Sequence, residues 1–106
     1  MVQVTYIQAD GSAHTVDVPK FHSVMEGATQ HGIDGIVAEC GGACACATCH
    51  CYVDPSWVDR FPKPKAEEIE MLEFAKSEYR SNSRLACQLI LADEHEGLVV
   101  RLPELQ

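Results

Sequence analysis

The chain has 106 residues, enough for one domain with its own hydrophobic core and too few for two, so residues 1–106 are expected to form a single domain. Its 46% hydrophobic and 23% charged residues are typical of a globular protein, and no apolar run approaches the roughly 20 residues of a membrane span. The formal net charge of −8, from 16 acidic and 8 basic residues, argues against nucleic acid or membrane lipid as a partner and favours a basic protein surface.

The N-terminal third of the chain predicts a hairpin followed by a helix. Val2–Gln8 and Ala13–Val18 are expected to be strands joined by a turn at Asp10-Gly11. The sequence Ser23-Val24-Met25-Glu26 is a capping box, in which the Ser and Glu side chains each accept a backbone N–H of the other residue. A helix should therefore begin after Ser23 and end at Gly32, a residue type common just past a helix end.

A cysteine-rich loop separates two short extended segments, and a second helix follows. Ile36-Val37 is expected to lead into the loop and Cys51–Asp54 to leave it as a strand. Ala66–Lys76 is helical by composition, with Ile69 and Leu72 spaced to face inward.

The C-terminal part predicts two more strands. Leu85–Leu91 is almost entirely apolar, which is typical of a central strand buried on both faces. Asp93–Gly97 should turn the chain, and Leu98–Leu102 should return as the last strand. The expected fold class is α+β, with a mixed sheet, one helix packed across it and a second helix on the surface.

The cysteines are clustered in a way that indicates a metal site. The stretch 40–51 reads CGGACACATCHC and holds five of the six cysteines, while Cys87 stands alone. The start MVQVTYIQAD lacks the features of a signal peptide, so a cytoplasmic location is expected, where thiols stay reduced. Neighbouring cysteines in one short loop also cannot pair without strain, which disfavours a disulfide framework.

Several cofactors must be weighed. Cys46-Ala47-Thr48-Cys49-His50 matches the C-x-x-C-H signature for haem attachment, with Met25 or Met71 as a formal second ligand, but the other cysteines would then have no role. A zinc site with four Cys ligands is geometrically possible, although only one C-x2-C pair is present. A thioredoxin-like pair should open a long helix, whereas a short strand is expected after this pair. A Rieske centre needs two His ligands, whereas His50 is the only histidine in the stretch 40–51. Both alternatives are therefore disfavoured.

An iron–sulfur cluster explains more of these residues. A 2Fe–2S cluster takes four thiolates, commonly three from one tight loop and one from a distant segment. Small residues between the cysteines let the backbone wrap the cluster and direct N–H groups at sulfur. Cys44 and Cys51 are interpreted as non-ligands, and His50 as a hydrogen-bonding brace for the loop. The expected ligands of one 2Fe–2S cluster are Cys40, Cys46, Cys49 and Cys87.

The C-x5-C-x2-C spacing and several other segments resemble the vertebrate-type 2Fe–2S ferredoxins, the family of adrenodoxin and putidaredoxin. The plant-type family has C-x4-C-x2-C instead. The resemblance covers essentially the whole chain and implies a β-grasp (ubiquitin-like) fold with the cluster in an exposed loop. The segments that carry it are residues 40–50, Tyr52-Val53, Met71-Leu72-Glu73, Ser83–Gln88 and Gly97–Val100.

This resemblance implies an electron carrier and not an enzyme. Members of the bacterial P450-linked class pass single electrons from an NAD(P)H-dependent flavoprotein ferredoxin reductase to a cytochrome P450 monooxygenase. Other members supply electrons for iron–sulfur cluster biogenesis, and a non-catalytic iron–sulfur regulatory module is a further alternative. The chain is expected to act as a monomer. Its ending, Pro103-Glu104-Leu105-Gln106, lacks the final tryptophan that putidaredoxin uses with its P450, so the identity of the acceptor stays open.

The resemblance also implies a docking surface for partner proteins, formed by acidic residues of the helix 66–76 and by residues near the cluster. Arg84 could equally be the partner of a structural salt bridge. The expected docking residues are Glu39, Glu67, Glu68, Glu70, Glu73 and Arg84.

Overall fold

The computed structural model describes residues 1–33, 50–73 and 78–103. Within these residues a five-stranded mixed sheet has the strand order β2-β1-β5-β3-β4. Strand β1 pairs in parallel with β5, and the other neighbours are antiparallel. The expected mixed sheet is confirmed. Its strands are β1 (Val2–Ile7), β2 (Ala13–Val18), β3 (His50–Val53), β4 (Ser83–Leu85) and β5 (Leu98–Arg101).

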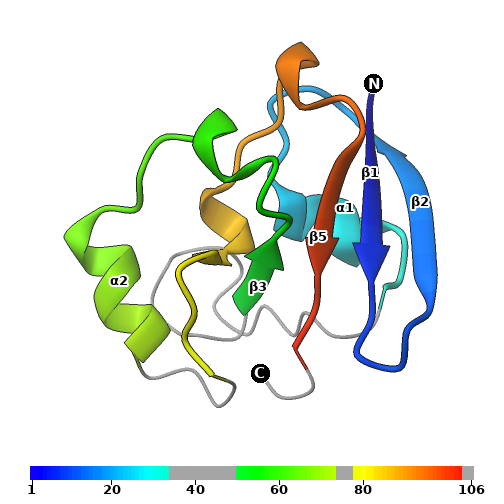
Figure 1. Cartoon of the computed structure of the whole chain (residues 1–106). Coiled ribbons are helices and arrows are strands. Elements are labelled where there is room, and N and C mark those ends of the chain that lie inside the picture. Colours follow the sequence, from blue (N-terminus) through cyan, green and yellow to red (C-terminus); the bar gives the residue numbers. More distant parts are fainter. Residues whose placement is uncertain (34–49, 74–77, 104–106) are drawn as a thin grey trace.

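The first helix, α1 (Val24–Gln30), forms as its capping signals predict and packs against one face of the sheet (Figure 1). The backbone N–H of Glu26 donates to Ser23 Oγ at 3.1 Å, and the Ser23 N–H donates to Glu26 Oε1 at 3.1 Å. Gly32 follows the helix end with φ 66°, a left-handed conformation that glycine adopts without strain. The Tyr6 hydroxyl donates to the Val24 carbonyl at 2.7 Å and ties β1 to this helix.

The apolar segment Leu85–Leu91 is not a central strand, and that prediction was wrong. β4 ends at Leu85 and lies at the edge of the sheet, and a 3₁₀ turn, η2 (Ala86–Gln88), follows it. Leu89 and Leu91 are buried, but Ile90 between them is 48% exposed. An apolar run shows that side chains are buried without showing by which backbone conformation. The middle strand of the five is β5.

The second helix, α2 (Ala66–Glu73), lies beside β4 and away from α1 (Figure 1). The predicted helix extends to residue 76, and residues 74–77 lie outside the described part, as does the predicted extended pair Ile36-Val37. Leu72 is buried as expected, whereas Ile69 is only half-buried. The inward-facing positions are therefore Glu68 and Leu72, one helical turn apart.

Two further 3₁₀ turns, η1 (Val58–Arg60) and η3 (Asp93–His95), are held together by a buried histidine. His95 Nε2 lies 2.9 Å from the Arg60 carbonyl oxygen, and its Nδ1 accepts the Ala92 N–H at 3.0 Å. Its ring stacks on Phe61 with the centroids 4.1 Å apart. These contacts connect the segment before α2 to the turn that precedes β5. In the described residues, no helix has the length and apolar character needed to cross a membrane.

Candidate metal centre

Cys87 lies close to the point where the strand β3 begins, directly after the cysteine-rich segment. It is in η2, directly after β4, and is 7% exposed. His50, the residue after Cys49 in the sequence, pairs with Leu85 across β3 and β4. The end of the loop therefore joins the sheet two residues from Cys87. The predicted ligands Cys40, Cys46 and Cys49 lie outside the described residues, together with Cys44 and Glu39.

The chemistry around Cys87 fits an iron–sulfur ligand. The Gln88 side-chain amide donates to Cys87 Sγ at 3.5 Å, and such donors stabilise negative charge on a ligating sulfur. Four thiolates are also the usual donor set of a 2Fe–2S cluster. Within the three described ranges, no group of three or more His, Cys, Asp or Glu side chains forms another metal site. Nothing in the sequence singled out the Gln88 amide except its position next to a predicted ligand.

His50 braces the point where the loop joins the sheet, as predicted. It is buried, and its Nε2 lies 2.9 Å from Ser83 Oγ, across the β3–β4 pair. Ser83 Oγ also accepts the Arg80 N–H at 2.8 Å. Burial, with a smaller effect from the Arg80 charge, lowers the pKa of His50 to about 4, so the ring is neutral near pH 7. Because this nitrogen is hydrogen-bonded to Ser83, His50 is poorly placed to be a haem ligand.

Cys51 belongs to the hydrophobic core. It is fully buried on β3, opposite Arg84 in the strand register. Burial raises the pKa of the Cys51 thiol to about 12, with the Arg84 charge opposing this effect. A protonated thiol in the core agrees with the interpretation that Cys51 is not a ligand.

Glu68 and Arg84 form a buried ion pair, so the prediction that they contact partner proteins was wrong. Glu68 is 3% exposed and Arg84 is 9% exposed. Arg84 Nε donates to Glu68 Oε2 at 2.6 Å, and a second guanidinium nitrogen donates to Oε1 at 3.1 Å. Arg84 also donates to the Pro62 carbonyl at 2.9 Å, and Glu68 Oε2 accepts the Leu85 N–H at 3.0 Å. The alternative role of Arg84 as a structural salt-bridge partner is confirmed.

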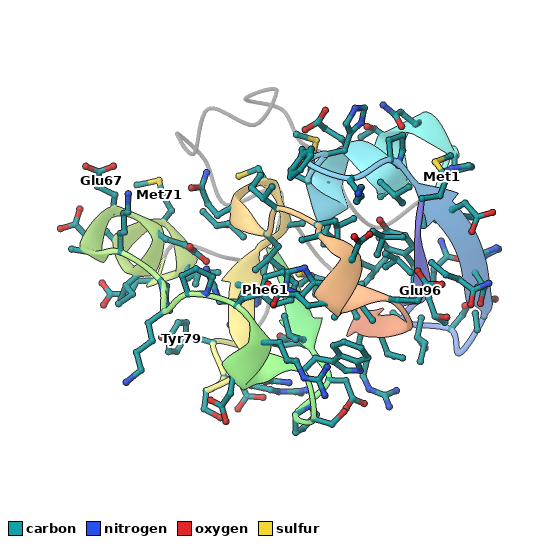
Figure 2. All side chains as sticks on the ribbon, turned by 90° about the horizontal axis from the view of Figure 1, so that it is seen from above. Met1, Phe61, Glu67, Met71, Tyr79 and Glu96 are labelled. Carbon is teal, nitrogen blue, oxygen red and sulfur yellow. The ribbon has the colours of Figure 1, made fainter. Side chains whose placement is uncertain are left out.

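The other acidic residues of α2 are solvent-exposed. Glu67, Glu70 and Glu73, which we call the acidic face of α2, are all exposed, and Figure 2 shows Glu67 pointing outward from the helix. The helix contacts β4, the strand that leads into Cys87. The buried Glu68–Arg84 pair holds the helix in this position. The acidic face is therefore carried beside the segment that bears Cys87, the predicted ligand within the described residues.

Comparison with known proteins agrees with this arrangement. Residues 7–92 match the family described as "2Fe-2S iron-sulfur cluster binding domain". The chain is 53% identical to rhodocoxin of Rhodococcus erythropolis over 106 residues, which is 100% of this chain and 99% of rhodocoxin. The crystal structure of a ferredoxin from Rhodopseudomonas palustris HaA2 is 47% identical, with a TM-score of 0.96 and 98% of both chains covered.

One similar structure contains a partner protein. It is the crystal structure of the covalent putidaredoxin reductase–putidaredoxin complex. The matched chain is 42% identical with a TM-score of 0.93, covering 95% of this chain and 97% of that one.

Proposed function

This chain belongs to the family of 2Fe–2S cluster binding domains, among the putidaredoxin-like ferredoxins, and we propose that it carries single electrons from an NAD(P)H-dependent flavoprotein ferredoxin reductase to a cytochrome P450 monooxygenase. Its cofactor is one 2Fe–2S cluster, and it is an electron carrier, not an enzyme. The observation that carries the proposal is similarity over the full length to rhodocoxin and to putidaredoxin in a reductase complex. A cytoplasmic location is proposed with it, because ligating cysteines must stay reduced.

In this proposal the cluster is held by Cys40, Cys46, Cys49 and Cys87, and when bound it supplies a one-electron couple. Two hydrogen bonds of the described residues contribute at the edges of this site. The His50–Ser83 hydrogen bond joins β3 to β4 where the loop ends. The Gln88 amide donates to Cys87 Sγ and favours added negative charge there.

The acidic face of α2 is proposed to dock the reductase. Its exposed carboxylates attract a basic partner surface and raise the rate of encounter, while leaving the complex short-lived. A carrier needs such brief contacts because it must release one partner before it meets the next. Glu39, which directly precedes the predicted ligand Cys40, is proposed as a contact for the P450. Attraction of this kind weakens as salt screens the charges.

The docking proposal is tested by neutralising the acidic face. The triple variant Glu67→Gln, Glu70→Gln, Glu73→Gln should be reduced by the reductase more slowly at low ionic strength. The difference from wild type should shrink as salt rises. A matched control neutralises Glu94 and Glu96, which are exposed near η3, and should change the rate little. Equal rates for the triple variant and wild type at low salt would rule out docking through this face.

The function itself is tested by spectroscopy and reconstitution. Anaerobically purified protein should show ferric–thiolate absorption that bleaches on reduction, with a spin-half EPR signal. The reduced protein should then support turnover of a P450 encoded near its gene. Rapid reduction by the reductase without P450 turnover would point to the cluster-biogenesis alternative. A protein that no reductase reduces would favour the regulatory-module alternative.

A further inference from the structure

Gln88 directs its side-chain amide at the sulfur of Cys87. Its Nε2 donates to Cys87 Sγ at 3.5 Å, although the Gln88 side chain is exposed and is not part of the hydrophobic core. The contact restrains a flexible side chain at the surface without burying it, so folding gains little from it. The chemistry of the sulfur is therefore the better reason for this contact.

The backbone around Gln88 is held by hydrogen bonds on the turn that carries it. The Leu89 N–H donates to the Ala86 carbonyl at 3.3 Å and closes η2, and the Leu89 carbonyl accepts the Val24 N–H of α1 at 2.9 Å. Leu89 is fully buried, and both views show η2 between α2 and α1 (Figures 1 and 2). The amide is thus presented to the sulfur from a packed element, as a well-positioned donor requires.

The charges on the neighbouring elements are paired with each other. Arg84 of β4 and Glu68 of α2 form the buried ion pair described above, so their opposite charges largely cancel at a distance. The reduction potential of an iron–sulfur cluster depends on the charge around it, on hydrogen bonds to its sulfurs and on its exposure. Among these three contributions, the hydrogen bond from Gln88 is the one on this side that a single surface side chain controls.

A donor aimed at a ligating sulfur acts on the potential in a known direction. Reduction adds negative charge to the cluster and its thiolates, and an N–H group stabilises that charge more in the reduced state than in the oxidised state. The donor therefore raises the potential. Because the Gln88 amide is exposed, water competes for it, and the gain should be close to that of one ordinary hydrogen bond.

We propose that the Gln88 side chain raises the reduction potential of the cluster through its hydrogen bond to Cys87, and so favours uptake of the electron over its delivery. Gln88 acts through the ligand and is a positioning residue in this sense. The effect on the potential requires only the bound cluster. The bias between uptake and delivery rests on the proposed carrier function.

The first test measures the midpoint potential of Gln88→Met in cluster-loaded protein by spectroelectrochemical titration. Met is similar in length to Gln and has no N–H donor, so the substitution removes the hydrogen bond while the side chain still covers the site. The equilibrium constant for reduction should fall by about fivefold, which corresponds to about 40 mV for one electron. Gln88→Glu replaces the donor with a charged acceptor and should lower the potential further.

Two more measurements separate this role from a structural one. In resonance Raman spectra of oxidised Gln88→Met, the Fe–S(Cys) stretching bands should move to higher frequency, because a sulfur without its donor gives more charge to iron. The midpoint of thermal unfolding should stay near that of wild type, since the side chain is exposed. The matched control is Gln3→Met, an exposed position on β1, which β5 and β3 separate from β4, and it should keep the wild-type potential.

The two electron transfers should respond to Gln88→Met in opposite directions. Reduction by the flavoprotein reductase should become slower, because the driving force falls. Oxidation of the reduced protein by ferricyanide, a small oxidant that needs no docking surface, should become faster. Loss of a docking contact would slow the first reaction and leave the second unchanged, so the pair of rates distinguishes a change in potential from a change in partner binding.

An unchanged or higher potential in Gln88→Met would overturn the proposal and leave the carrier function standing. A lower potential with unchanged Raman bands would also overturn it, because the hydrogen bond to sulfur would not be the cause. Wild-type protein without ferric–thiolate absorption would refute the cofactor, and both the proposed function and the role of Gln88 would fail. If the wild type holds its cluster but supports no P450 turnover, the proposed function alone fails, and the potential of Gln88→Met still decides the role of this side chain.

Discussion

Replacing Arg84 with Met removes the positive charge from a buried ion pair that joins β4 to α2. The guanidinium makes two hydrogen bonds to Glu68, at 2.6 and 3.1 Å, and one to the Pro62 carbonyl at 2.9 Å. Without it, a carboxylate that is 3% exposed keeps only the Leu85 N–H at 3.0 Å. Leaving one buried charge without its partner costs about 3–5 kcal/mol of folding free energy.

This cost should be visible as a lower midpoint of thermal unfolding, followed by far-UV circular dichroism at a fixed scan rate. At roughly 4 °C per kcal/mol for a domain of this size, the midpoint of Arg84→Met should fall by roughly 12–20 °C. The midpoint of Glu68→Gln should fall by a comparable amount, because this substitution leaves the guanidinium charge without its partner. The double variant Glu68→Leu, Arg84→Met should unfold at a higher temperature than either single variant, since no buried charge remains.

The result that refutes this reasoning is specific. If Arg84→Met unfolds within about 2 °C of wild type, the pair does not hold α2 on β4 with the expected free energy. If the double variant is less stable than both single variants, the pair contributes through packing and its neutral hydrogen bonds instead of its charges. The matched control is Arg80→Met, which removes the exposed ion pair with Glu78. It should shift the midpoint little, because exposed ion pairs contribute at most about 1 kcal/mol.

Three further predictions concern the core and the cluster. Gly27→Ala should destabilise the protein by about 1–3 kcal/mol in chemical denaturation, although alanine favours helices, because its Cβ would lie 2.6 Å from Tyr6 Oη. The control Gln30→Ala, at an exposed position of the same helix, should leave the free energy of unfolding nearly unchanged. Burial, and to a lesser extent the Cys51 charge, raises the pKa of Tyr6 above its ordinary value of 10.0, so the stability that the Tyr6 hydroxyl contributes is present below pH 10 and lost as the pH rises further. The stability advantage of wild type over Tyr6→Phe, about 1 kcal/mol at pH 7, should therefore shrink above pH 10. An advantage that stays constant with pH would contradict this. Cys87→Ser should lose or strongly weaken the visible absorption of the cluster while the sheet persists by circular dichroism; full colour in this variant would remove Cys87 from the ligand set.

Local sequence signals predicted the parts of the fold that depend on neighbouring residues. The hairpin at Asp10-Gly11 and the capping box at Ser23 and Glu26 involve groups a few residues apart, so their chemistry acts wherever the segment lies. The cysteine spacing belongs to the same class, because a loop that ligates one cluster must bring its thiolates within a few ångströms along a short chain. The family and the cofactor were therefore readable from the sequence.

Only the tertiary structure decided what depends on residues far apart in the chain. The apolar run Leu85–Leu91 predicted burial correctly for most of its residues, but the edge position of β4 was set by pairing with β3. In the sequence, nothing distinguishes Glu68 from the exposed glutamates beside it. Only its ion pair with Arg84 of β4 allows this carboxylate to be buried. Phe21 carried no sequence signal, because its left-handed backbone is imposed by Leu91, a partner seventy residues away. Sequence specifies contacts between near neighbours, whereas a side chain's exposure is a property of the whole packed chain.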